Sequence, residues 1–190
     1  MKKVLLTLAA LALSGTAMAG PSWTFVDLGY ITGDSEDDNP IDGYSLRGSF
    51  GFGDIWHVQG FVANIEDDFN DVDTYGIRGG IHPALTDNTD FVLDLGYAQA
   101  DNDSNGQEPS AFDIRTGVRS NIGNVELRSF ISLVFGDDDE GGDEEFRSVM
   151  YSVGGQYNFS DAWSVGADAT VGGSTFVGAD LIDLYVRWSF

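Results

Sequence analysis

The stretch Leu184-Tyr185-Val186-Arg187-Trp188-Ser189-Phe190 closes the sequence and decides the fold class. Apolar residues occupy every second position in it, and the alternation continues backward to Ile182. Alternation with a period of two is typical of a β-strand that has one apolar face. The strand stops on an aromatic residue, Phe190. The terminal stretch therefore predicts a β-protein whose last strand is amphipathic.

The opposite end of the sequence reads as an export signal. Two lysines precede a predominantly apolar run over 4–13, and Ala17-Met18-Ala19 supplies a small-x-small cleavage site. This order is typical of a cleaved signal peptide, which we expect over 1–19, with one mature domain over 20–190. An exported chain that ends on an alternating aromatic strand points to the outer membrane of a Gram-negative bacterium.

Basic residues are scarce in the mature domain. Both lysines lie in the signal, which leaves seven arginines against 31 acidic residues and a formal charge of −24. A surface this negative repels nucleic acid, so a nucleic-acid partner is excluded. The sequence contains no cysteine, so we expect neither disulfides nor a lipid-anchored amino terminus.

The mature domain alternates apolar and polar residues almost throughout, with Gly, Asp and Asn at regular breaks. No apolar run in it approaches the ~18–20 residues of a membrane-spanning helix, so any span must consist of strands. We predict an all-β protein, a transmembrane antiparallel up-and-down β-barrel of ten strands, with eight strands as the alternative. The predicted strands are 22–32, 41–52, 55–65, 73–82, 90–99, 111–121, 125–135, 147–159, 162–172 and 176–190.

The connections between these strands alternate in length. One set is short, as at 53–54 and 160–161, and the other is mostly longer and acidic, as at 34–40 and 136–145. Bacterial outer-membrane barrels have short turns in the periplasm and longer loops outside. We therefore place the short turns in the periplasm and, because the strand count is even, both termini with them.

Alternation alone does not say whether the apolar face points inward or toward lipid. A secreted soluble barrel would bury this face, whereas a membrane barrel exposes it. We favour the membrane because the aromatic residues form two predicted girdles and the polar face lacks lysine. The tryptophans at the short-turn ends are Trp23, Trp56, Trp163 and Trp188, and the tyrosines at the other ends are Tyr30, Tyr44, Tyr75 and Tyr97. The alternation of its strand places Trp23 on the face opposite to the apolar residues, which indicates a bulge or an inward side chain.

With its signal peptide, alternating hairpins, short turns and aromatic last residue, the chain resembles the small outer-membrane β-barrel proteins of the OmpA-like and opacity-type (porin-like) superfamily. The resemblance covers the whole chain as architecture, although the better-known members have eight strands. It implies that the barrel assembly machinery reads the last strand during biogenesis. The residues that match this assembly signal are Ile182, Leu184, Val186, Trp188 and Phe190.

Charged residues gather on the polar face of the predicted strands. Those expected to face the lumen, six acids and six arginines, are Asp27, Arg47, Arg78, Asp94, Asp113, Arg115, Arg119, Glu126, Arg128, Asp168, Asp183 and Arg187. The expected neighbours are Asp27 with Arg47, Arg78 with Asp94, and Glu126 with Arg119 and Arg128. Unpaired charges in so narrow an interior would be costly to desolvate, so we favour a salt-bridged plug. The alternative is a narrow porin-like channel for ions or small solutes, lined by the same residues.

The longer loops are rich in carboxylates, which favour hard divalent cations. Asp101, Asp103 and Asn105 copy the first ligands of an EF-hand loop, but Phe112 stands where the closing glutamate belongs. We therefore expect either a solvated, self-repelling surface or loosely bound calcium or magnesium. Such cations would bridge the loops to the phosphates of lipopolysaccharide. No other cofactor is expected.

The sequence does not indicate an enzyme. His57 and His82 both fall at the short-turn mouth, and a histidine pair without a third ligand is usually structural. No serine, acid and histidine converge at the outer rim. We therefore expect a non-enzymatic barrel with a structural or surface-interaction role that presents acidic loops outward, with its external partner left open.

Overall fold

The computed structural model of the chain describes residues 21–35, 40–66, 71–102, 106, 108–137, 145–172 and 179–190. These residues form strands and turns, and no helix long and apolar enough to cross a membrane occurs among them. The strands are β1 (Phe25–Ser35), β2 (Pro40–Phe52), β3 (Trp56–Glu66), β4 (Asp71–Ile81), β5 (Ala84–Thr86), β6 (Thr89–Asn102), β7 (Ser110–Ile122), β8 (Val125–Asp137), β9 (Glu145–Asn158), β10 (Trp163–Val171) and β11 (Ala179–Ser189).

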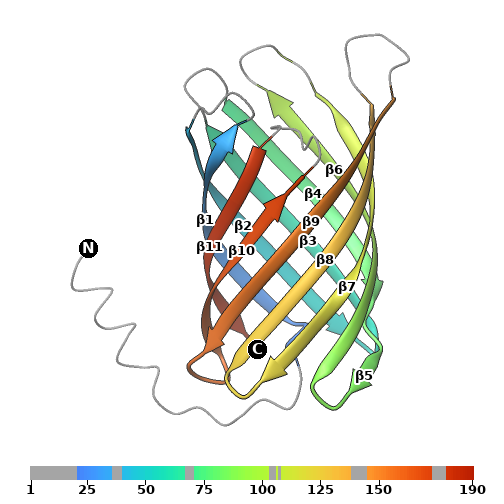
Figure 1. Cartoon of the computed structure of the whole chain (residues 1–190), viewed down its shortest axis with the longest axis vertical. Helices are drawn as coiled ribbons and strands as arrows, with labels where there is room; N and C mark the ends of the chain where they lie inside the picture. The colour runs from blue at the N-terminus through green and yellow to red at the C-terminus, as the bar shows by residue number, and fades with distance from the viewer. Residues whose placement is uncertain are drawn as a thin grey trace, which may run out of the picture.

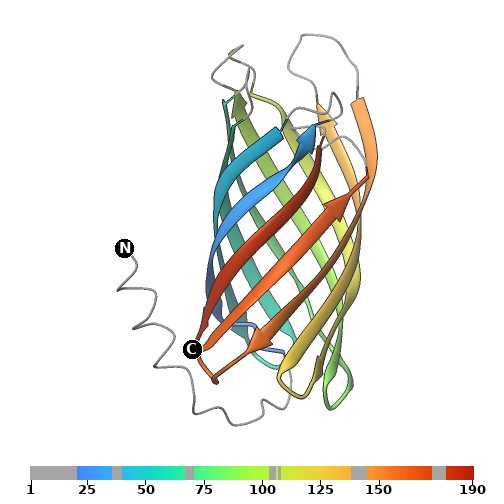
Figure 2. The same cartoon turned by 60° about the vertical axis from the view of Figure 1, so that its left-hand side comes forward.

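Ten of these strands close into a barrel (Figure 1). Consecutive strands of the barrel pair antiparallel, with β4 paired to β6 and not to the short β5. The first and last strands pair along their length from Phe25 with Ser189 to Ser35 with Ala179. β1 and β11 lie side by side in Figure 2. Closure leaves no unpaired sheet edge in the barrel. The prediction of an antiparallel up-and-down barrel of ten strands is confirmed.

The observed strands extend beyond the predicted ranges mainly where the longer loops begin. β1 ends at Ser35 rather than at 32, and β6 ends at Asn102 rather than at 99. Backbone ladders continue there because their hydrogen bonds do not require apolar side chains. β5 was not predicted; it is a three-residue strand that pairs irregularly with the start of β6 inside a turn.

The two ends of the barrel differ. Residues 53–55, 123–124 and 159–162 make short turns at the end where β1 begins and β11 finishes, which we call the short-turn end. Gly53 and Gly123 have φ values of 60° and 62°, a conformation that glycine adopts without steric cost. The opposite end, where the longer connections lie, is called the loop end. This asymmetry agrees with the predicted alternation of connections.

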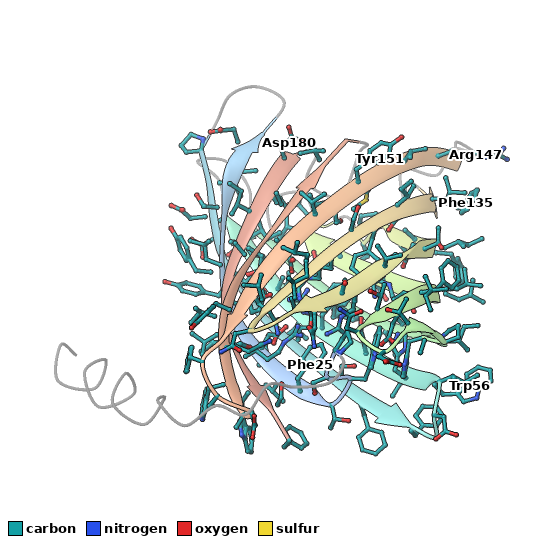
Figure 3. The ribbon with its side chains drawn as sticks, turned by 60° about the horizontal axis from the view of Figure 1, so that its bottom comes forward. Phe25, Trp56, Phe135, Arg147, Tyr151 and Asp180 are labelled. Carbon is teal, nitrogen blue, oxygen red and sulfur yellow. The ribbon has the colours of Figure 1, made fainter. Side chains whose placement is uncertain are left out.

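The outer face of the barrel is apolar. Leu28 and Leu95 each expose 65% of their surface, and Trp56 and Phe135 point away from the strands, whereas Phe25 lies inside (Figure 3). Aromatic side chains also gather near both rims, as in Trp163 and Trp188 at the short-turn end, with ring centroids 6.4 Å apart. A water-facing surface rarely carries an apolar band this extensive. The open question of which face points inward is thus answered: the polar face lines the lumen.

Candidate functional site: a charged plug in the lumen

The lumen holds all twelve charged residues that the sequence placed there. Each of them is buried or half-buried, while most of the side chains next to them along the strands face outward. The most deeply buried side chains of the structure include Arg187, Glu126, Asp27 and Asp94, each with about 1% of its surface exposed. Buried charges of this kind require close partners, because desolvation costs several kcal/mol per ion.

Seven of these residues form one continuous chain of ion pairs across the lumen. The links are Arg187–Asp27 (2.7 Å), Asp27–Arg47 (2.9 Å), Arg47–Asp168 (3.3 Å), Asp168–Arg128 (2.7 Å), Arg128–Glu126 (3.4 Å) and Glu126–Arg119 (2.9 Å). Three of the links are bidentate, those of Arg187 with Asp27, Arg128 with Asp168 and Arg119 with Glu126. Bidentate arginine–carboxylate pairs fix both distance and orientation. The expected positions of Asp27 opposite Arg47 and of Glu126 between two arginines agree with this chain.

Two further ion pairs occupy the other side of the lumen, and one corrects an expectation. Asp94 accepts from Arg115 Nε at 2.7 Å and lies 2.9 Å from Nε2 of His57. Arg78, expected near Asp94, instead makes a bidentate pair with Asp113 at 3.1 and 3.2 Å. The difference arises because Arg78 is in register with Gly96 and Gly96 with Asp113, so the guanidinium reaches across a strand that has no side chain there.

The same arrangement, in which a glycine lies between two partners on a central strand, recurs in the lumen. Gly154 lies in register with both Arg128 and Asp168, and a Cβ placed on it would meet Asp168 Oδ1 at 1.8 Å. Gly80 lies in the same way between His57 and Asp94, with Asp94 Oδ1 at 2.0 Å. These glycines are therefore required for space. The sequence did not predict this role, because it depends on which residues of three neighbouring strands lie in register.

Aromatic rings pack against the arginines of this network of ion pairs in the lumen, which we call the plug. The guanidinium carbon of Arg187 lies 3.5 Å from the ring centroid of Phe25, and that of Arg119 lies 4.2 Å from the ring centroid of Trp23. The hydroxyl of Tyr185 forms a short hydrogen bond with Arg128 Nη2. Cation–π contacts of this kind stabilise arginine side chains that are removed from water.

The segment before β1 lies across the short-turn end of the lumen. Trp23 is only 8% exposed and points inward, which resolves its irregular parity and removes it from the predicted outer girdle. Its indole Nε1 donates to Asp90 at 2.8 Å, and its carbonyl accepts from Ser49 Oγ at 2.8 Å. The carbonyl of Ser22 accepts a hydrogen bond from Arg119 at 3.0 Å. We call 21–24 the strap.

The two histidines lie together at this end, as expected. Their ring centroids are 5.4 Å apart, and each ring stacks on Trp23 at 4.2 Å. His82 follows the end of β4, and burial lowers its pKa, although the carbonyl of Trp56 at 3.3 Å from Nε2 opposes this effect. Both rings are buried within an aromatic stack, which favours a structural role for the pair.

The loop-end half of the lumen is different, and its character was not predicted. Inward-facing residues there are small, aliphatic or hydroxyl-bearing, for example Ile31, Ile65, Ala98, Val134 and Met150. Together with charged residues such as Arg47 and Asp168, and with Trp23 and Phe25 nearer the short-turn end, they line a cavity of about 330 Å³, which we call the chamber. Glu126, Asp27, Asp94 and His57 do not line the chamber. The signal for the chamber, aliphatic residues on the polar parity of several strands, was present in the sequence but was obscured by the charges beside it.

The remaining predicted sites are placed only in part. Among the described residues, no group of three or more His, Asp or Glu side chains could hold a metal ion. Asp101 lies in β6, whereas Asp103 and Asn105 fall outside the described residues. The proposed assembly residues Ile182, Leu184, Val186, Trp188 and Phe190 all expose their side chains on the outer face.

The chain was compared with known proteins. No family model and no curated protein matches it. An outer membrane channel from Pseudomonas putida F1 is similar over 94% of this chain and 97% of its own length, with a TM-score of 0.56 and 8% identity. The Yersinia pestis outer membrane protein Ail matches over 90% of this chain and 100% of its own, with a TM-score of 0.46 and 14% identity.

A loop-deletion mutant of OmpT, an outer membrane protein of Vibrio cholerae, matches over 88% of this chain, with a TM-score of 0.43 and 18% identity. This chain spans 59% of that protein's length. At 8% identity, the similarity to the Pseudomonas putida channel shows a shared fold and nothing finer. The chain therefore has the fold of a small outer-membrane β-barrel.

Proposed function

We propose that this protein is a non-enzymatic barrel of the bacterial outer membrane whose lumen is sealed, with a structural or surface-interaction role. The apolar outer face supports residence in lipid, and the asymmetry of turns and loops supports a periplasmic short-turn end. The loops then face outward, where their carboxylates meet the medium and the lipopolysaccharide.

The observation that carries this proposal is the chain of seven ion-paired residues across the lumen. Its members come from β1, β2, β7, β8, β10 and β11, so it ties opposite walls of the barrel together. A solute would have to break bidentate pairs and displace the strap to pass. Removing one partner of a buried pair typically costs ~3–5 kcal/mol, which is a large barrier to spontaneous opening.

Conductance of the refolded protein in a planar bilayer tests the seal. A heat-dependent shift on a gel first establishes that the barrel is folded. We expect the native barrel to be silent, and Arg47→Ala or Asp94→Ala to lower the thermal stability or to open measurable conductance. Arg147→Ala is the matched control, because Arg147 is exposed at the loop end of β9 and lies outside the lumen.

A narrow channel is the second candidate, and the chamber is the observation that favours it. A cavity of about 330 Å³ already exists inside the lumen and is bordered by several of the same charged residues. Reproducible conductance steps in the native protein, altered in size by Arg47→Ala but not by Arg147→Ala, would replace the sealed-barrel proposal with transport.

Cation binding by the loops stays a prediction. Calorimetry with calcium and magnesium in low salt would reveal loose binding as a heat that disappears at high ionic strength. The absence of any heat would leave the acidic loops as a solvated surface.

A further inference from the structure

We propose that the chamber binds a small apolar amine, with the hydrocarbon part against the aliphatic wall and the ammonium group against Asp183. This proposal goes beyond a sealed barrel, because a seal at the short-turn end does not require a hollow, apolar loop-end half. A cavity of about 330 Å³ lies at the lower end of the ~300–1,000 Å³ that is typical of sites for small ligands.

The wall of the chamber selects an apolar body. Ile31 and Ile65 are buried and pack with Leu181, while Val134 and Met150 line the opposite side. Aliphatic residues on the lumen side of a membrane barrel gain nothing from facing water, whereas the methylenes of a ligand packed against them would be removed from water. The methionine thioether adds a side chain that adapts to irregular shapes.

The floor of the chamber selects a cationic group. Five of the six predicted lumen acids have an arginine within 3.4 Å. Asp183 is the exception: among the described residues it accepts only from Ser45 Oγ, at 3.2 Å to each carboxylate oxygen, and no arginine lies within 4.0 Å. It is half-buried and lines the chamber. Its neighbour in register across β10 and β11 is another acid, Asp168, which already binds Arg128 and Arg47.

Six arginines also line the chamber, but each already has a carboxylate partner, which leaves less of their charge for an anionic ligand. Arg128 donates from Nε, Nη1 and Nη2 to protein acceptors, and Arg78 donates from Nε and Nη2 to Asp113. The carboxylate of Asp183 still has free acceptor capacity after its bonds from Ser45. An ammonium group at this point would supply three hydrogen-bond donors. It would also bring to Asp183 the positive charge that no arginine supplies by direct contact.

Calorimetry on the full chain in lipid nanodiscs tests the proposal with octylamine, octanol and octanoate as probes, and with empty nanodiscs subtracting partition into lipid. We expect saturable binding of one octylamine per barrel, at least tenfold tighter than octanol, and no binding of octanoate. Asp183→Asn should lower the affinity for octylamine to that for octanol and leave the affinity for octanol unchanged.

Two further variants separate the chamber from the surrounding lipid. Ala111→Phe fills the chamber, because Ala111 is buried on its wall, and should abolish binding of both probes. Leu95→Phe enlarges a lipid-facing side chain and should change neither affinity. The heat-dependent gel shift confirms folding of each variant. Heats no larger than those of empty nanodiscs, or an amine preference that survives Asp183→Asn, would overturn the proposal.

Discussion

At the scale of single residues, the lumen depends on positions that have no side chain. Gly154 lies between Arg128 and Asp168, and any Cβ there would overlap the Asp168 carboxylate. The two partners of such an ion pair reach each other across a central strand. The size of the residue between them therefore decides whether the buried ion pair forms. This is why the pairing of Arg78 with Asp113 was missed when only the register of adjacent strands was considered.

Gly154→Ala should therefore destabilise the barrel. Overpacking typically costs ~1–3 kcal/mol, and displacement of Asp168 from Arg128 adds to it. Gly60→Ala is the control, because Gly60 faces outward and its added Cβ would come no closer than 3.8 Å to another atom. Urea unfolding in lipid vesicles, followed by tryptophan fluorescence, measures both variants. Equal midpoints for the two would contradict the spatial role of Gly154.

The stability of the short-turn end should depend on pH through His82. Burial lowers its pKa below the ordinary value of 6.5, so the folded chain binds fewer protons than the unfolded chain between these two values. The contribution to stability is complete above about pH 6.5 and is lost as the pH falls toward the lowered pKa. The urea midpoint should fall from pH 7.5 to pH 5. His82→Gln should flatten this part of the pH profile, and a profile that keeps its full slope in this variant would assign the effect to other groups.

At the scale of elements, the last strand combines two roles. Tyr185 and Arg187 face the lumen and take part in the plug, and Asp183 lines the chamber, whereas Trp188 and Phe190 expose their rings on the outer face. Phe190 is 66% exposed and contacts Trp188 at a centroid distance of 4.9 Å. Its ring therefore contributes little to the folded barrel, although its backbone N–H donates to the carbonyl of Thr24 in the strap at 3.2 Å.

Phe190→Ala should accordingly separate assembly from stability. If the assembly machinery reads this residue, the amount of folded barrel in the outer membrane of cells should fall several-fold, while the refolded protein changes by less than about 1 kcal/mol. Phe112→Ala removes a similarly exposed phenylalanine, 64% exposed, from β7 and should leave the amount unchanged. Quantitative immunoblots of outer-membrane fractions provide the measurement, and equal amounts for both variants would exclude the proposed signal.

At the scale of the whole molecule, the plug acts as one unit because its charges share partners. Arg47 contacts both Asp27 and Asp168, and Arg128 contacts both Asp168 and Glu126. Loss of one member leaves a buried charge on the opposite wall without its partner. The barrel wall and the plug therefore stabilise each other.

This coupling predicts a strongly non-additive double-mutant cycle. Arg128→Met and Asp168→Leu should each cost ~3–5 kcal/mol, because each strands a buried charge. The double variant should be more stable than the sum of the two losses implies by at least 1 kcal/mol, since it removes both charges and adds apolar volume. Urea unfolding of all four proteins in vesicles checks this. Additive losses would mean that the two residues act independently.

Alternation by itself determined the class of this protein. The period of two, the length of the strands, the alternating connections and the aromatic end indicated an all-β barrel of ten strands, because these features depend only on local geometry and on the bilayer. Parity also placed the twelve charged residues inside, for the same reason.

Only the tertiary structure decided how those residues combine. Barrel closure staggers the strands and brings Arg47 of β2 to Asp168 of β10, two residues that no hairpin register relates. Closure also turns Trp23 onto the two histidines and gathers aliphatic residues from distant strands around one chamber. Contacts across a lumen depend on the stagger of the closed sheet and on the space left by glycines, and neither follows from the pattern of any single strand.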